Sequence, residues 1–451
     1  MKISFLGGAG TVTGSKFLIT SEDNQVLVDC GLFQGLKQLR LLNWEKIDID
    51  VKNLKAVFLT HSHMDHCGYL PLLVRQGFKG TIYCTPPTEE IARIVLLDSA
   101  KIQMEEAEYA NKKKFSKHQP AKPLYDLEDV EKTLPLFRAV NFNQKYNFHG
   151  FEVEFKSSGH ILGAASVYLT KNGRRLLFSG DLGQYHDALM QPPDDPLAAD
   201  VVVMESTYGD RLHSIVRSSD LLQKMINETW QKKGILLIPA FALGRSQNLI
   251  HEIQLLKKQG LIPREIPVYF NSPMGSQICE LYSKYQDYQK LRAKDFAADL
   301  EQVRFIASAE ESQQLNETKD PAIIIAASGM LEGGRVLHHI KAFGGNPNNT
   351  ILLAGYQALG TRGWSLAHGQ NKIKIHGNFV DILAQIVTSD SFSAHADQQE
   401  LLRWIGAIPA KPQKIFIVHG EPIASDELRK LVEEKLQTSV TVPLLNSVHE
   451  V

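Results

Sequence analysis

Three histidines and one aspartate occupy the short stretch 61–66 of this 451-residue chain, as His61, His63, Asp65 and His66. Imidazole nitrogens and carboxylate oxygens are typical ligands of zinc, or of manganese where oxygens dominate. No cysteine is placed to complete a closed structural zinc site. We therefore predict a metal centre with ligands for two adjacent ions, rather than a histidine-rich surface loop or hydrogen-bonded core histidines.

Four groups are too few for two metals, so further ligands must come from distant parts of the chain. Six other acidic or imidazole side chains follow apolar, strand-like segments. They are Asp29, His160, Asp181, Glu205, His395 and His419. Taken singly, each fits a structural role, but their shared place at strand ends predicts one site at the edge of a β-sandwich.

The elements that must hold these residues follow an α/β pattern. His61 and His63 are two positions apart on extended chain, so both rings face one side, and Asp65 and His66 turn into a following helix. Expected strands cover 2–6, 15–20, 25–28, 54–59, 81–85, 151–155, 166–170, 175–178, 199–204 and 414–418, and expected helices cover 69–75 and about 89–111.

The pattern changes after about residue 210, where helices and apolar strands alternate. The helices are expected at 219–233, 246–258 and 275–285, and the strands at 234–239, 267–271, 322–326 and 350–354. This alternation predicts a second α/β unit with a parallel sheet.

Several motifs together resemble the metallo-β-lactamase superfamily, whose fold is an αββα sandwich. They are the HxHxDH run, Gly159-His160, Gly180-Asp181 and His419. Three further motifs are similar to those of the β-CASP branch, which includes ribonuclease J and the nuclease subunit of the polyadenylation cleavage factor. These are Glu205-Ser206-Thr207-Tyr208, Ser393-Ala394-His395-Ala396-Asp397 and Val418-His419-Gly420-Glu421.

The resemblance covers essentially the whole chain and implies a role for each residue. It implies one domain in two parts, 1–209 and 388–451, with an inserted α/β β-CASP domain at 210–387. It assigns His61, His63 and His160 to one zinc ion, and Asp65, His66 and His419 to a second, with Asp181 as the bridge. Asp29 would orient an imidazole without touching metal, and Glu205 would hold His395.

The inserted domain would lie over the substrate as a lid, with backbone amides and basic side chains against the RNA backbone. Arg245 and Arg335 fit an ion-paired structural role equally well. The sequence departs from the family pattern at Asn248, where an acid is usual, and at Trp364, where arginine is usual. The expected substrate contacts are Arg245, Ser328, Gly329, Arg335, Gly360, Thr361, Arg362 and Lys372.

These features together predict a zinc-dependent ribonuclease that acts on single-stranded RNA. A hydroxide shared by two Zn²⁺ ions about 3.5 to 4 Å apart would attack phosphorus. His395, held by Glu205, would donate a proton to the leaving oxygen, and Asp65 and Asp181 would complete the catalytic group. The resemblance implies a 5′-phosphate product. Endonucleolytic and 5′–3′ exonucleolytic modes both remain open.

Two other function classes remain open. Hydrolysis of a small ester or thioester is known in the superfamily, although Glu205, His395 and the large insert argue against it. A non-catalytic RNA-binding scaffold is the other, although all seven ligand positions are filled.

Composition narrows these predictions only slightly. The formal net charge of −1 neither favours nor excludes nucleic acid, since a local basic groove would suffice. Four scattered cysteines, no signal-peptide pattern and no long apolar run favour a reduced, cytoplasmic protein without a membrane segment, with homodimerisation open. Gly7-Gly8-Ala9-Gly10 lacks the spacing of a dinucleotide site. The basic run Lys112-Lys113-Lys114, with Lys117 and His118, is either a solvated surface or a polyanion contact.

Overall fold

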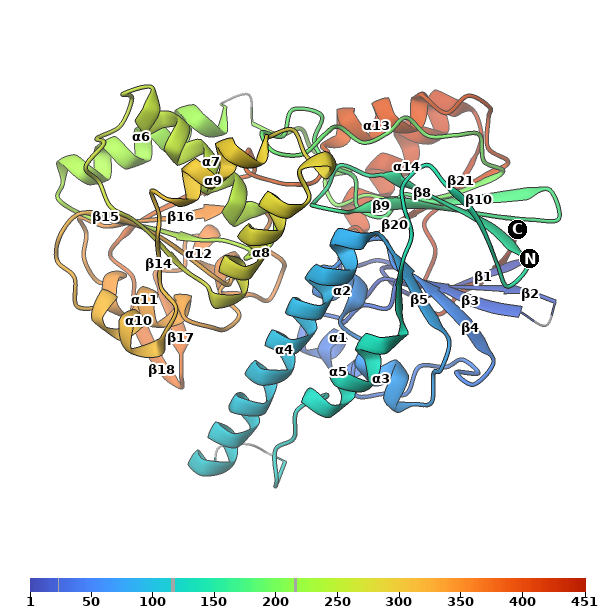
Figure 1. The fold of residues 1–451 in the computed structure, drawn as a ribbon, viewed down its shortest axis with the longest axis horizontal. Helices are drawn as coiled ribbons and strands as arrows, with labels where there is room; N and C mark the ends of the chain where they lie inside the picture. The colour runs from blue at the N-terminus through green and yellow to red at the C-terminus, as the bar shows by residue number, and fades with distance from the viewer. Residues whose placement is uncertain (23, 115–117, 215–216) are drawn as a thin grey trace. The chain divides into compact units, whose positions relative to one another are not determined.

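Two seven-stranded sheets pack face to face in the first of two compact units (Figure 1). The computed structural model describes residues 1–22, 24–114, 118–214 and 217–451. Unit 1 comprises Met1–Asp187, Gln191–Leu212 and His395–Val451, and unit 2 comprises Ala188–Met190 and His213–Ala394. The domain boundaries expected from the sequence, 1–209, 210–387 and 388–451, stay a prediction.

The first sheet of unit 1 has the strand order β22-β1-β2-β3-β4-β5-β6. Its first half is antiparallel, and β3 to β6 run parallel. The strands are β1 (Lys2–Gly7), β2 (Lys16–Ser21), β3 (Asn24–Val28), β4 (Leu54–Phe58), β5 (Thr81–Cys84), β6 (Phe137–Ala139) and β22 (Val448–Glu450). The pairing of β22 with β1 was not expected, because the sequence shows no partner for so short a segment.

The second sheet has the order β21-β20-β11-β10-β9-β8-β7. Strands β10, β11, β20 and β21 are parallel, and β7 to β10 form antiparallel pairs. The strands are β7 (Lys145–Phe148), β8 (Phe151–Ser157), β9 (Ala165–Lys171), β10 (Arg174–Phe178), β11 (Val201–Glu205), β20 (Lys414–Val418) and β21 (Ser439–Thr441).

Strand β11 illustrates how the sandwich is built, because all of its residues are buried. Val201 and Val203 join the core between the two sheets, while Val202 and Met204 pack under the outer helices. A strand covered on both faces needs a continuous apolar run, as the sequence has here.

Helices cover the outer face of each sheet, so the expected αββα sandwich is confirmed. On the first sheet lie α2 (Met64–Cys67), α3 (Leu70–Arg75), α4 (Pro86–Lys113) and α5 (Leu127–Thr133), and on the second lie α13 (Gln398–Gly406) and α14 (Pro422–Leu436). The remaining short helices of the unit are α1 (Lys37–Leu42) and η1 (Leu134–Leu136). No helix in the described ranges combines the length and apolar character that membrane crossing requires.

Unit 2 is built on a six-stranded sheet of order β14-β13-β15-β12-β16-β19, in which every pair is parallel, as expected. Its strands are β12 (Ile235–Pro239), β13 (Val268–Asn271), β14 (Arg304–Phe305), β15 (Ala322–Ala326), β16 (Thr350–Ala354) and β19 (Gln385–Ser389), with a separate hairpin of β17 (Lys372–Ile375) and β18 (Asn378–Asp381). Its helices are α6 (Ser218–Gln231), α7 (Arg245–Lys258), α8 (Pro273–Lys284), η2 (Gln286–Tyr288), α9 (Ala293–Leu300), α10 (Ala309–Leu315), α11 (Val336–Phe343) and α12 (Arg362–Ala367).

Candidate metal centre

The chemistry-bearing side chains of unit 1 follow the carboxyl ends of parallel strands. Asp29 follows β3, His61 follows β4, Asp181 follows β10 and His419 follows β20, while Glu205 ends β11. Because parallel strands of one sheet end at the same edge, Asp29 and His61 lie at one edge of the first sheet, and Asp181, Glu205 and His419 lie at one edge of the second. Asp181 contacts His61 and His66, so the two edges meet at the centre. Asp29 and His419 have left-handed backbone conformations, with φ of 57° and 48°. Such backbone strain in non-glycine residues concentrates at functional sites.

The turn that carries Asp65 and His66 is fixed by backbone hydrogen bonds from two other segments. Ser15 N donates to Asp65 O at 2.9 Å, and Cys30 N donates to His66 O at 2.7 Å. Gly31 lies so close that a Cβ there would be 1.6 Å from Asp65 O. Only glycine permits this approach, so the end of β3 sets the position of both ligands.

Three loops from distant parts of the chain join side by side at the centre. The Asp181 loop lies between the other two, because Gly159 bridges to Leu182 and Gly183 bridges to His395. Gly183 N also donates to Ser158 O at 2.8 Å, next to the His160 loop. These backbone contacts bring His160 and His395 to Asp181 across large sequence separations.

The first group of candidate ligands is His61, His63, His160 and Asp181, whose ligand atoms all lie within 4.8 Å of one another. His63 Nδ1 is 3.1 Å from His61 Nε2 and 3.2 Å from His160 Nε2. Asp181 Oδ2 is 3.4 Å from His61 Nε2 and 3.6 Å from His160 Nε2. Three imidazole nitrogens and one carboxylate oxygen thus converge, as zinc ligands do.

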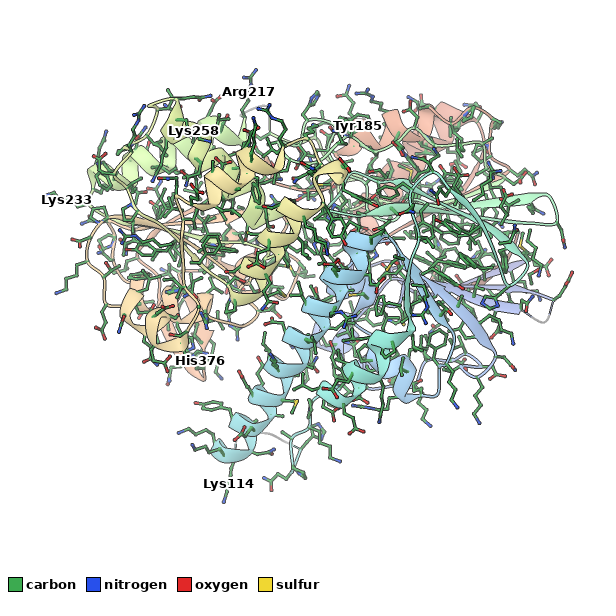
Figure 2. All side chains as sticks on the ribbon, in the orientation of Figure 1. Lys114, Tyr185, Arg217, Lys233, Lys258 and His376 are labelled. Carbon is green, nitrogen blue, oxygen red and sulfur yellow. The ribbon has the colours of Figure 1, made fainter. Side chains whose placement is uncertain are left out.

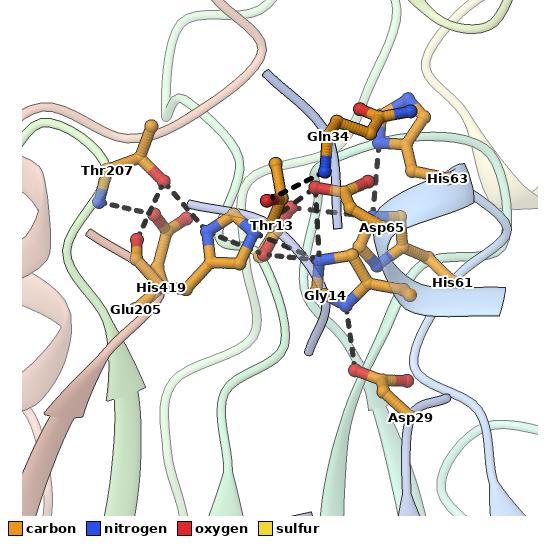
Figure 3. A network of polar contacts seen from close by, with 12 residues as sticks. Thr13, Gly14, Asp29, Gln34, His61, His63, Asp65, Glu205, Thr207 and His419 are labelled. Atoms are coloured by element: carbon orange, nitrogen blue, oxygen red, sulfur yellow. Dashed lines mark hydrogen bonds and ion pairs between the residues drawn. The ribbon is translucent and has the colours of Figure 1, made fainter. Parts of the chain in front are cut away.

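The second group is Asp65, His66 and His419, also within 4.8 Å. His419 Nε2 is 3.2 Å from His66 Nε2. It is 3.4 Å from Asp65 Oδ2, and both His419 and Asp65 are labelled in Figure 3. Asp181 faces this group with its other oxygen, since Oδ1 is 3.3 Å from His66 Nε2. One carboxylate therefore presents a different oxygen to each group, which is the arrangement a bridging ligand requires.

The electrostatics of the centre fit positive ions. Burial lowers the pKa of His63 to about 4, so its ring is neutral and able to bind metal. Burial opposes a charge on His66, but Asp181 and Asp29 hold its pKa well above the usual range. Burial likewise opposes a charge on His419, whose pKa is raised by Asp181 and Asp65. Protons on these rings balance the carboxylate charges, and divalent cations would take over that role and displace the protons.

Asp29 and Thr207 contact ligand imidazoles at Nδ1, and Thr60 donates hydrogen bonds to Asp29. Asp29 Oδ2 is 2.8 Å from His66 Nδ1 and accepts a hydrogen bond from Thr60 Oγ1 at 2.8 Å, while Oδ1 accepts from Thr60 N. Thr207 Oγ1 lies 3.1 Å from His419 Nδ1 (Figure 3). Sequence reasoning anticipated Asp29 but gave no role to Thr60 or Thr207, although each stands next to a recognised ligand or motif residue.

Replacing Asp29 by asparagine is expected to weaken metal binding by about 10- to 100-fold, because the carboxylate that orients His66 is lost. Competition with a chromophoric chelator measures the change. Asp200→Asn is a matched control, since Asp200 accepts a hydrogen bond from Arg175 N just before β11, at the other end of the strand. Equal metal affinity in both variants would contradict the role of Asp29.

Glu205 and His395 form a third group with Asp181. Glu205 Oε1 is 3.2 Å from His395 Nδ1 and accepts a hydrogen bond from Leu182 N at 2.6 Å. Thr207 N donates to the other oxygen, Oε2, at 3.1 Å. Glu205 is buried and His395 is half-buried, so a fixed carboxylate holds an imidazole that keeps access to solvent.

The expected substrate contacts lie in unit 2, and most of their polar atoms already have protein partners. Arg335 donates to Asn271 Oδ1, Ile306 O and Ala307 O. Arg362 donates to the carbonyls of residues 331, 332 and 374. These contacts favour structural roles for both arginines.

Two of the other expected contacts, Thr361 and Lys372, also have polar partners within the protein. Thr361 caps α12 by accepting from Trp364 N, and Lys372 pairs with Asp381 at 3.0 Å. Arg245 is buried, and its guanidinium packs 3.2 Å from where a Cβ of Gly355 would be. Ser328, Gly329 and Gly360 lie in loops after β15 and β16 and remain predictions as RNA contacts.

Three family profiles match successive parts of the chain. The metallo-beta-lactamase superfamily matches residues 9–219, the Beta-Casp domain matches 246–366, and the Zn-dependent metallo-hydrolase RNA specificity domain matches 380–443. Ribonuclease TTHA0252 of Thermus thermophilus is 34% identical over 93% of each chain. The chain belongs to the metallo-β-lactamase superfamily, in its β-CASP branch. The resemblance inferred from the motifs is thereby confirmed.

Other proteins are similar over nearly the whole chain. An RNase J-like protein of Methanocaldococcus jannaschii is 30% identical over 99% of both chains. Transcription termination factor FttA of Methanosarcina mazei is 28% identical, over 97% of this chain and 69% of its own length. A solved structure of a protein of unknown function from Enterococcus faecalis V583 has a TM-score of 0.54 with 13% identity over 99% of both chains, a likeness of fold alone.

Proposed function

We propose that the protein is a ribonuclease with two zinc ions that hydrolyses phosphodiester bonds of single-stranded RNA. The observation that carries this proposal is the pair of ligand groups on the two oxygens of Asp181. The proposed ligands of one ion are His61, His63 and His160, and those of the other are Asp65, His66 and His419, with Asp181 shared. When bound, the ions would supply Lewis acidity, acidify a water molecule and neutralise charge on the phosphoryl oxygens.

The protein's own groups would orient the ligands and move the proton. Asp29 holds the Nδ1 side of His66, and Thr207 lies at the Nδ1 side of His419, so that Nε2 of each ring faces the centre. Glu205 holds Nδ1 of His395, so Nε2 is the nitrogen that would donate a proton. A water oxygen would attack phosphorus and form the new P–O bond while the bond to the leaving 3′ oxygen breaks. The leaving oxygen would take the proton from His395, and the proton lost by the water would pass to solvent. The product fragment then carries a 5′ phosphate.

RNA is favoured as the substrate for two reasons. Ribonuclease TTHA0252 and the RNase J-like protein are similar over nearly the whole chain. The RNA specificity domain matches residues 380–443, which include His395 and His419. A small ester or thioester substrate would need neither Glu205 nor His395 at the centre.

The deciding experiment is incubation of zinc-analysed protein with single-stranded RNA labelled at either end, beside DNA of the same sequence. We expect RNA cleavage that stops when a chelator removes metal and returns when zinc is added. A ladder of fragments would indicate internal cleavage, and mononucleotides from the 5′ end would indicate an exonuclease. Hydrolysis of a thioester without cleavage of RNA would contradict the proposal.

A further inference from the structure

Helix α4 extends from the metal centre to a basic end. At its first turn, the hydroxyls of Thr85 and Thr88 both donate to Gly163 O, at 2.6 and 3.0 Å, in the loop that carries His160. The helix then runs for 28 residues, which is about 42 Å at 1.5 Å per residue. Figure 1 shows its second half extending past the other elements of unit 1, and Figure 2 labels Lys114 at the far end.

The described chain that follows α4 is hydrogen-bonded to the side of this helix. The projecting half of α4 and this segment therefore form one ordered arm. Asn111 exchanges two hydrogen bonds with Ala121, at 2.7 and 3.0 Å. Further back, Gln103 Oε1 accepts from Leu124 N at 3.0 Å, and the hydroxyl of Tyr125 donates to Ser99 at 2.8 Å. These hydrogen bonds hold the described residues near the end of α4 in place. Residues 115–117, and so Lys117, lie outside the described ranges.

The tip of the arm, Lys112 to Lys114 with Lys122, is rich in positive charge, although the net charge of the whole chain is −1. Residues 101–122 contain six lysines against three glutamates, and the glutamates, at 105, 106 and 108, precede the lysines of the tip by one turn or more. Lys112, Lys113 and Lys114 are exposed, and within the described parts of the chain the side chains of these three make no ion pair. Exposed lysines at the end of such an arm, with no ion pair to any described residue, suit a polyanion rather than a structural role.

We propose that the basic tip of this arm, Lys112 to Lys114 with Lys122, binds the phosphate backbone of single-stranded RNA at a distance from the metal centre. The inference rests on the proposed ribonuclease function and adds an anchoring site for long substrates. A span of about 42 Å corresponds to about 12 nucleotides if the bases stay stacked at about 3.4 Å each, and to about half that number if the strand is extended, so an RNA of about 5 nucleotides cannot reach both places. Long RNA therefore gains affinity from the tip, and short RNA does not.

The test compares the wild-type protein with the variant K112Q/K113Q/K114Q, using RNAs of about 5 and about 30 nucleotides, lengths on either side of that span. Binding is measured by fluorescence anisotropy, with metal removed to prevent cleavage, between 50 and 200 mM salt. The salt slope is the steepness with which the logarithm of the binding constant falls as the logarithm of the salt concentration rises. Each phosphate contact on a single strand contributes about 0.7 to this slope, so the loss of three contacts lowers it by about 2. Wild-type affinity for the long RNA should then fall about 18-fold more than that of the variant across this range.

The matched control is K46Q/K52Q/K79Q, which removes the same charge from exposed lysines of unit 1, two of them just before β4 and β5. It should bind both RNAs as the wild type does. Unchanged slope and affinity of the arm variant for long RNA would overturn the proposal. Cleavage of the short RNA by the arm variant at the wild-type rate reports on the ribonuclease function separately, so the two ideas fail independently.

Discussion

Replacing Asp181 by alanine is expected to lower kcat/KM for RNA by at least about 10³-fold. In the proposed function Asp181 is the bridging carboxylate, because it faces one ligand set through Oδ2 and the other through Oδ1. Its loss removes a ligand of both ions, and the stabilisation that metal ions give to a transition state is worth several kcal/mol, with 1.36 kcal/mol for each tenfold change. The measurements are the initial rate on a short RNA and the zinc content of the dialysed protein, which should fall together.

Asp48→Ala is a suitable control, because Asp48 is an exposed carboxylate of the same unit. It should keep the metal content and rate of the wild type, and circular dichroism should show that both variants are folded. An Asp181→Ala protein that holds two zinc ions and cleaves at the wild-type rate would refute the bridging role.

Replacing His395 by alanine should lower kcat by about 10²- to 10⁴-fold without loss of zinc, since general acid catalysis contributes that much. His395 Nδ1 is 4.0 Å from Asp181 Oδ2 and is bound to Glu205, so it lies beside the ligands but belongs to neither group. The decisive measurement uses RNA with sulfur in place of the leaving 3′ oxygen. A thiolate leaves without a proton, so the variant should approach the wild-type rate on this substrate.

Glu205→Gln provides the companion measurement, because glutamine keeps the side-chain shape but loses the charge that fixes the imidazole. Glu205 is a positioning residue, so its variant should show a smaller defect that the sulfur substrate also relieves. An equal defect of His395→Ala on oxygen and sulfur substrates would show that His395 does not act as the acid.

The run His61 to His66 was recognisable from the sequence because its ligands are nearly contiguous and are carried by one strand and one turn. Asp181 and His419 were recognisable as strand-end residues, since an apolar strand that ends in a ligand type is a local pattern. The roles of Thr60 and Thr207 could not be seen in this way, because each depends on a hydrogen bond to a residue whose position only the folded chain sets. The sequence also could not show that Arg335 and Arg362 donate hydrogen bonds to backbone carbonyls of other segments, because those segments meet only in the folded chain.

The sequence by itself determined the metal-ligand chemistry and the α/β pattern of the elements, because residue type, spacing and apolar periodicity are local properties. The αββα sandwich was implied by the family resemblance of its motifs. Only the tertiary structure decided that the two oxygens of Asp181 face different ligand groups, and that Lys112 to Lys114 at the end of α4 form no ion pair with the acidic residues it describes. Both facts depend on contacts between segments, such as the backbone bridge between Gly183 and His395 and the hydrogen bond from Ala121 N to the Asn111 side chain. A linear pattern cannot encode such contacts, because their geometry exists only once the strands and loops have packed.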